Sequence, residues 1–275
     1  MTILAVEKRC NHIYVASDSR YSIGDIHIDN GSKIFKEKCV ISNPLKGFIH
    51  MSVGFAFDGN VTFFFNFKNR IEFILHNVLV SAYDDDYDEI LLDLIKNCFS
   101  DLCLECCDKI DVEGDVLVFF NSLATGSALA YKIMYDPVKD DVVLSMIPNG
   151  LTFYGSGANV AQRLNGLNQY VNIVRFMKNV LAYKGNEETI GGNIQIGELS
   201  KDGFRVLGYQ DYDETSVDFG PHYYFGSSKV PNYENFQPME GSFLVIYSEE
   251  ELKEMARKNT MMLTGIDPSV LGSSY

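Results

Sequence analysis

The sequence is poor in positive charge, long apolar runs and secretion signals. Its 23 Lys and Arg residues stand against 37 Asp and Glu residues, so the formal net charge is -14. This balance argues against non-specific nucleic-acid binding, because phosphates attract basic surfaces. No apolar run approaches the roughly 20 residues that cross a bilayer, and no basic stretch followed by an apolar one marks a signal peptide at the N-terminus. We therefore expect a cytoplasmic protein with neither a nucleic-acid partner nor a membrane attachment.

The cysteines do not form a disulfide framework. Four of the six lie close together, which could indicate a metal site. The same stretch, residues 87–110, also has apolar residues at helical spacing, which favours a helix that buries its cysteines as small core residues. The five histidines are scattered and offer no paired ligands. We favour core packing in a reducing compartment over metal binding and expect no cofactor; the clustered cysteines are Cys98, Cys103, Cys106 and Cys107.

The order of the apolar patterns predicts the fold class. A hydrophobic fraction of 46% supplies a sizeable core. Strands come first, followed by two helices, more strands, two helices and two last strands, which predicts an α+β protein of stacked antiparallel sheets with helices on their outer faces. The expected strands are 2–6, 13–16, 33–35, 48–57, 115–121, 128–135, 142–148, 194–198 and 204–208. The expected helices are 60–80, 87–110, 157–171 and 173–183.

The composition changes after residue 210. Nine aromatic residues from 212 to 247 are interspersed with Gly, Pro, Asn and Asp and show no helical period. Ser248 and Glu251 form a capping-box pattern that predicts a short helix to residue 259. We expect a domain over residues 1–210 and an aromatic-rich extension over residues 211–275. The extension would pack on its own domain or on a neighbouring subunit.

The second residue is the first candidate for chemistry. An initiator methionine is generally removed before a small residue such as Thr2. Removal would leave a hydroxyl and a free α-amine on one residue. The amine has a reference pKa near 8, so it can accept the hydroxyl proton close to neutral pH. Thr2 alone is weak evidence, because many proteins begin with Met-Thr.

Two further residues strengthen the hypothesis. Asp18 follows the second expected strand, and Lys33 lies fifteen residues later. A lysine near Thr2 would lower the pKa values of its hydroxyl and amine, and Asp18 would keep that lysine charged and oriented. Taken alone, an Asp-Lys pair is more simply a weak surface salt bridge.

Three segments together resemble the proteasome β-subunit and its simpler bacterial relatives, the N-terminal-nucleophile (Ntn) threonine hydrolases. They are Thr-Ile-Leu-Ala-Val from residue 2, Ala-Ser-Asp-Ser-Arg from residue 16 and Ser-Lys-Ile from residue 32. The resemblance extends over residues 2–210 and is best over residues 2–60. It implies a four-layer αββα sandwich of two antiparallel sheets. The Thr2–Asp18 spacing matches the family, and the Thr2–Lys33 spacing is slightly shorter.

The resemblance also implies roles for other residues. Gly54 would supply the backbone N–H of an oxyanion hole, and Ser156, in Gly-Ser-Gly before a helix, would support the amine of Thr2. Ser52 would border the pocket for the side chain that precedes the cleaved bond, and Ser22 would bind substrate backbone. Arg20 is an accessory candidate.

One segment departs from the family pattern. Where the family places an aspartate and a serine before Gly-Gly, this chain has Glu187 and Ile190 before Gly191. Glu187 could replace the aspartate, but Ile190 cannot form the hydrogen bonds of a serine side chain. Support of the free amine is therefore weaker than in the family.

Three functions follow as hypotheses. The first is a threonine peptidase that hydrolyses peptides or unfolded proteins within a homo-oligomer such as a ring, with or without an ATPase partner. The second is an inactive scaffold subunit with the same fold, which retention of Met1 and the presence of Ile190 would favour. The third is an amidase for small non-peptide amides, although such enzymes more often use cysteine, and Cys10 is not at a plausible N-terminus.

Overall fold

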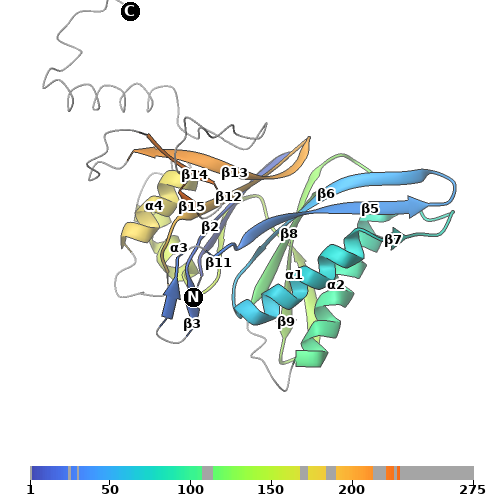
Figure 1. The fold of residues 1–275 in the computed structure, drawn as a ribbon, viewed down its shortest axis with the longest axis horizontal. Helices are drawn as coiled ribbons and strands as arrows, with labels where there is room; N and C mark the ends of the chain where they lie inside the picture. Colours follow the sequence, from blue (N-terminus) through green and yellow to red (C-terminus); the bar gives the residue numbers. More distant parts are fainter. Residues whose placement is uncertain are drawn as a thin grey trace, which may run out of the picture.

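The computed structural model describes residues 2–23, 26–29, 31–106, 114–167, 173–183, 190–212, 221–225 and 228–229. Its strands form two large sheets, and the helices lie in two pairs on different sides of the molecule (Figure 1). Helices α1 (Val61–Leu75) and α2 (Tyr87–Cys106) form one pair, and α3 (Ala158–Leu167) and α4 (Ile173–Tyr183) form the other. The chain is therefore a mixed α/β protein in which strands predominate.

The first sheet carries the N-terminal strand in its interior. Its order in the described residues is β11-β1-β2-β12-β13-β14-β15, and each neighbouring pair for which a register is given is antiparallel. The hairpin of β1 and β2 places Leu4 opposite Ser17, so Thr2 lies near the end of β2 that carries Asp18. The strands are β1 (Leu4–Arg9), β2 (His12–Asp18), β11 (Gly150–Tyr154), β12 (Ile194–Ser200), β13 (Gly203–Tyr212), β14 (Pro221–Phe225) and β15 (Ser228–Lys229).

The second sheet contains the long hairpin that follows Lys33. Its order in the described residues is β10-β9-β8-β6-β5-β7, and only the short β5–β7 contact is parallel. A small separate hairpin, β3 (Tyr21–Ile23) with β4 (Ile26–Ile28), connects the two sheets along the chain. The strands of the second sheet are β5 (Ile34–Asn43), β6 (Gly47–Phe57), β7 (Val78–Leu79), β8 (Asp115–Asn121), β9 (Ala128–Asp136) and β10 (Asp141–Met146).

Three apolar clusters account for the core. One joins the second sheet to α1 and α2, and another joins the first sheet to α3 and α4. The third contains residues of both sheets, so their inner faces pack on each other. At its centre the Phe204 ring stacks on Phe119, with ring centroids 5.7 Å apart. Alternate residues of each strand serve different clusters, as the two-residue period of a strand requires.

The cysteine-rich stretch is helical, as predicted. Cys98, Cys103 and Cys106 are at most 8% exposed and pack in the cluster between α2 and the second sheet. Cys107 lies outside the described residues. Among the residues that are described, no group of His, Cys, Asp or Glu side chains is arranged to hold a metal ion. Likewise, none of the helices described here combines the length and apolarity needed to span a membrane.

The elements differ from the predicted ones at several points. The first long helix ends at Leu75 rather than at residue 80, because the chain turns there and β7 joins the edge of β5. Strand β11 was not predicted, and it becomes a strand by pairing with β1. The predicted boundary at residue 210 falls inside β13, which β14 and β15 extend. The predicted helix at 248–259 lies outside the described residues, and the division into two parts remains a prediction.

Candidate active site

Thr2 is held by the turn that precedes α3. Its backbone N–H donates to Ser156 Oγ over 3.1 Å, and its carbonyl accepts from the Gly157 N–H over 3.1 Å. Gly155 has a φ of +83°, and a Cβ on it would overlap the Thr2 carbonyl oxygen. Only glycine therefore fits at this point of the turn. Thr2 itself is 5% exposed.

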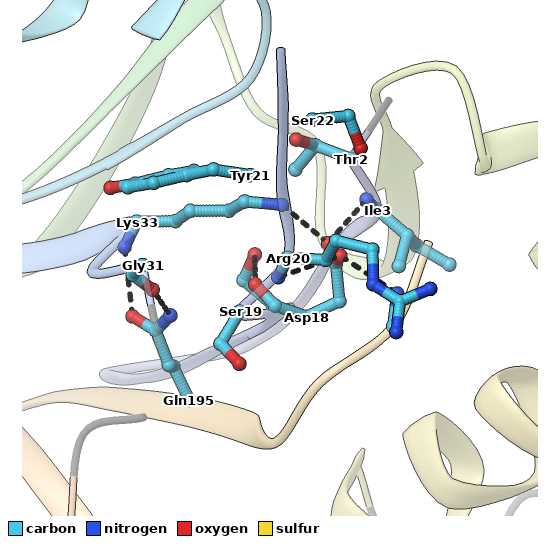
Figure 2. Close-up of polar contacts among 12 residues, drawn as sticks. Thr2, Ile3, Asp18, Ser19, Arg20, Tyr21, Ser22, Gly31, Lys33 and Gln195 are labelled. Carbon is cyan, nitrogen blue, oxygen red and sulfur yellow. Dashed lines mark hydrogen bonds and ion pairs between the residues drawn. The ribbon is translucent and has the colours of Figure 1, made fainter. Parts of the chain in front are cut away.

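Asp18 joins this N-terminal segment to Lys33. Its Oδ1 accepts from the Ile3 N–H over 3.0 Å and from the Lys33 ammonium over 2.9 Å. Its Oδ2 accepts backbone N–H groups of Arg20, at 3.3 Å, and Gly191, at 3.2 Å. Figure 2 shows the side chain of Lys33 extending alongside the Tyr21 ring toward Asp18. Asp18 thus fixes both the start of the chain and the position of the ammonium group.

The Lys33–Asp18 pair is inaccessible to water. The exposed fractions of the two side chains are 1% and 0%. Burial lowers the pKa of the Lys33 ammonium, while the negative charges of Asp18 and Asp58 raise it and the Arg20 cation lowers it. Removing two charges from water is costly, and a buried pair is seldom explained by stability alone. A perturbed buried lysine beside a specific partner marks a candidate functional site.

Gln195, which was not predicted, positions the backbone of Lys33. It is 1% exposed on β12, and its Oε1 accepts the N–H groups of Lys33 at 2.8 Å and Ile34 at 3.2 Å. Its amide nitrogen donates to the Gly31 carbonyl (Figure 2). A polar residue between the two isoleucines of a buried strand was the signal that could have identified it.

Asp58 is a second carboxylate of this region that was not assigned a role. It follows β6, whose last residue, Phe57, donates its N–H to the Lys33 carbonyl over 3.1 Å. Asp58 Oδ1 accepts the Asp115 N–H over 2.7 Å, and its Oδ2 lies 2.9 Å from the place of a Cβ on Gly155. Burial and the neighbouring Asp115 charge raise the pKa of Asp58 to about 6.

Arg20 and Ser22 lie on the chain that leads from Asp18 into the β3–β4 hairpin. Arg20 binds both carboxylate oxygens of Asp29, at 2.5 and 2.9 Å, and its guanidinium occupies the space where Gly191 would carry a Cβ. Ser22 Oγ lies 3.0 Å from His27 Nδ1. Their predicted contacts with substrate remain predictions.

Gly54 and Ser52 are not brought into this group of residues. Both lie within β6, where Gly54 pairs with β5 on one side and β8 on the other. A Cβ on Gly54 would overlap the Phe204 ring, so packing between the sheets already requires glycine here. Ser52 Oγ accepts the Phe204 N–H over 2.8 Å. The described contacts do not link either residue to Thr2, and their roles in substrate and oxyanion binding remain predictions.

The segment before Gly191 is described only in part. Glu187 lies outside the described residues. Ile190 is fully buried, and its Cδ1 lies 2.6 Å from the place of a Cβ on Gly157. The residue that departs from the family pattern therefore packs against the turn that holds Thr2.

The comparisons with known proteins support the fold. No family model and no curated protein matches the chain. Among solved structures, the Anbu complex of Pseudomonas aeruginosa, described as a helical assembly, is similar with a TM-score of 0.51 and 13% identity, covering 79% of this chain and 88% of that one. A Gly-1 mutant of Anbu from Hyphomicrobium sp. strain MC1 has a TM-score of 0.50 and 12% identity, covering 75% and 84%.

These findings correct the family assignment made from the sequence. The assignment of this chain to the bacterial proteasome-related branch of the threonine hydrolases was wrong, because no family model or curated relative supports it. The short matching segments are too few to establish descent. The similarity to Anbu proteins, at 13% identity or less, concerns the fold alone. We conclude that this chain has a fold similar to that of Anbu proteins.

Proposed function

We propose that the protein is a hydrolase that cleaves peptide bonds with Thr2 as its nucleophile after Met1 is removed. The observation that carries this proposal is the buried Lys33–Asp18 pair, whose carboxylate also holds the residue next to Thr2. An ion pair that serves only stability could lie anywhere in the fold. An ion pair that lowers the pKa of an N-terminal nucleophile has to lie next to the start of the chain.

The arrangement suits a residue that acts as nucleophile and base. The nitrogen of Thr2, once free, would accept the proton of its own hydroxyl, directly or through water. Ser156 Oγ, 3.1 Å from this nitrogen, would orient it. A charged Lys33 would lower the pKa values of the hydroxyl and the amine by its field. The ester formed on Thr2 would then be hydrolysed by water that the same amine activates.

A peptide epoxyketone tests this proposal, because it forms a stable ring only with a hydroxyl and a free amine of one residue. We expect the purified chain to lack Met1 by intact mass and to gain one inhibitor mass. Thr2→Ala should abolish the adduct while leaving the fold intact. Ser156→Ala is the second variant. It should slow adduct formation without abolishing it, because the amine loses its hydrogen-bond partner but can still accept the hydroxyl proton.

Three results would contradict the proposal: retention of Met1 on protein made in cells with methionine aminopeptidase, an adduct that survives Thr2→Ala, or no adduct on protein with a free Thr2. Cleavage of small amides without cleavage of peptides would instead support an amidase. A scaffold without turnover is the second candidate. The packing of Ile190 against the Thr2 turn favours it, because an isoleucine offers the amine no hydrogen bond.

We also infer a four-layer αββα arrangement and a homo-oligomer. The four-layer arrangement is supported by three apolar clusters: one between the first helix pair and the second sheet, one between the two sheets, and one between the first sheet and the second helix pair.

The homo-oligomer is supported by large apolar side chains that are at least 71% exposed around α1 and the β5–β6 hairpin. Light scattering on the purified chain tests the oligomer, and a monomer at micromolar concentration would contradict it. These side chains are Leu45, Phe48, Phe73, Leu79 and Tyr83.

A further inference from the structure

A hollow of about 710 Å³ opens between the two sheets. Its lining comes from the β5–β6 hairpin, the end of β8 and the turn between β12 and β13. Figure 1 shows the β5–β6 hairpin projecting to the right, beyond the strands of the first sheet. The lining residues used in the argument are Lys36, Lys38, Ser52, Lys201 and Phe204.

The turn between β12 and β13, on one side of the hollow, lies away from Asp18. Strand β12 runs from Ile194, opposite Asp18, to Leu199, opposite Ile13, and the turn of the hollow follows directly. Five residues of strand separate these two ends of β2, a distance of about 17 Å at 3.3–3.4 Å per residue. The lining contains none of Thr2, Asp18 and Lys33, so the hollow is distinct from the group of residues around Thr2.

Its floor is fixed by contacts between the sheets. Phe204 fills the space above Gly54, and its N–H donates to Ser52 Oγ over 2.8 Å. At the neighbouring strand end, the Asn121 side chain donates to the Ser200 carbonyl over 2.7 Å. The shape of the hollow is thus determined by packing and hydrogen bonds between the two sheets.

Lysines dominate its charge. Lys36 and Lys38 occupy alternate positions of β5, opposite Gly54 and Ser52, so both lie on the face that opens into the hollow. Glu37, between them, lies on the other face and interacts with Glu72 and Lys68 of α1. In the described part of the chain, the ammonium groups of Lys36, Lys38 and Lys201 take part in no hydrogen bond or ion pair.

The nearby acidic groups do not neutralise these lysines. Asp202 is the one carboxylate among the described lining residues. Asp88 is not among the lining residues, and its carboxylate accepts from Ser122 Oγ and from the Leu123 N–H at 2.9 Å. The Arg205 guanidinium belongs to the opposite face of β13, where it pairs with Glu198. Three free ammonium groups thus gather in one hollow of a chain whose net charge is -14.

We propose that this hollow binds an acidic peptide segment. Its volume falls within the range of about 300–1,000 Å³ that is usual for ligand sites and is far larger than the roughly 30 Å³ of one water molecule, so a single small anion would leave most of it empty. Several carboxylates spaced along a peptide match two lysines of β5 and a third on the turn between β12 and β13. The net charge of -14 would disfavour such a peptide at sites without clustered lysines.

Fluorescence anisotropy with a labelled hexaglutamate peptide tests the proposal on the full chain, with hexaglutamine as the neutral counterpart. We expect hexaglutamate to bind, hexaglutamine not to bind, and added salt to weaken the complex. The variant Lys36→Gln/Lys38→Gln/Lys201→Gln should weaken binding by roughly tenfold or more. Lys139→Gln is the matched control, because Lys139 lies on the β9–β10 turn and pairs with Asp136.

Equal binding of both peptides, or no binding of hexaglutamate, would overturn the proposal. So would full affinity in the triple variant, once circular dichroism has shown that it is folded. Displacement of the peptide by an equimolar amount of inorganic phosphate would show a small-anion site instead. Tighter binding of a single-stranded oligonucleotide that the same variant abolishes would assign the hollow to nucleic acid.

Discussion

The ammonium group of Lys33 lies 2.9 Å from Asp18 Oδ1, with both side chains shielded from solvent. This contact links the start of the second sheet to the end of β2, and through Ile3 it reaches the residue proposed as nucleophile. Its energetic and chemical consequences can be measured separately.

Removal of one member of this pair should destabilise the protein strongly. Asp18→Ala or Lys33→Ala leaves the other charge buried without a partner, which costs about 3–5 kcal/mol. The double variant Asp18→Asn/Lys33→Met should lose less than either single variant, because no charge remains buried and the asparagine oxygen can still accept a backbone N–H. Urea denaturation measures all three. The exposed Lys46–Asp85 pair is the control, and its disruption should leave the midpoint nearly unchanged. Single variants as stable as this control would contradict the prediction.

Asp58 should make stability depend on pH. Its pKa is raised from 3.8 to about 6 in the folded state, so the folded protein binds the proton more tightly than the unfolded chain. Protonation therefore stabilises the fold as the pH falls from above 6 toward 4. The ionised carboxylate costs stability above pH 6. Asp58→Asn retains an acceptor for Asp115 and removes this dependence.

Urea denaturation between pH 4.5 and 8 checks the effect of Asp58→Asn. From pH 4.5 to pH 8, the free energy of unfolding of the variant should rise by about 1–3 kcal/mol relative to that of the wild type, after allowance for the partial exposure of Asp58. Asp202→Asn, at the exposed turn after β12, is the control. A difference between variant and wild type that stays constant over this range would exclude a raised pKa at Asp58.

Gly54→Ala should destabilise the contact between the sheets. The new methyl group would overlap the Phe204 ring, and overpacking of a core typically costs about 1–3 kcal/mol. Gly166→Ala on α3 is the matched control, because a Cβ there meets nothing within 4 Å. In a helix this exchange should be neutral or slightly stabilising. Equal denaturation midpoints for the two variants would show that Phe204 has room to turn aside.

Gln195→Leu should affect both stability and chemistry. It leaves the buried N–H groups of Lys33 and Ile34 without their acceptor, at about 1–3 kcal/mol each. Because the backbone of Lys33 would shift, adduct formation with the epoxyketone should also slow. Gln162→Leu, on the exposed side of α3, should change neither. Unchanged adduct formation in a destabilised Gln195→Leu protein would limit Gln195 to a structural role.

Some elements of this protein are encoded by local sequence. The apolar periodicity of α2, the start of α1 and the strands β1 and β2 need only neighbouring residues, and they lie close to where the sequence predicted them. Asp18 and Lys33 were selected because their segments resemble those of the threonine hydrolases, not from the pair alone. Their burial was not predictable, since the same two residues on a surface would form a weak ion pair.

Tertiary structure decided what local patterns could not. Strand β11 exists because β1 offers it an edge, and Gln195 matters because β12 passes beneath Lys33. Gly54 was selected for its backbone N–H, yet its surroundings are set by Phe204 from the other sheet. The sequence by itself determined the kinds of residues and their order. Only the packing of the two sheets decided which of them share water-free space, because that packing depends on contacts between residues far apart in the chain.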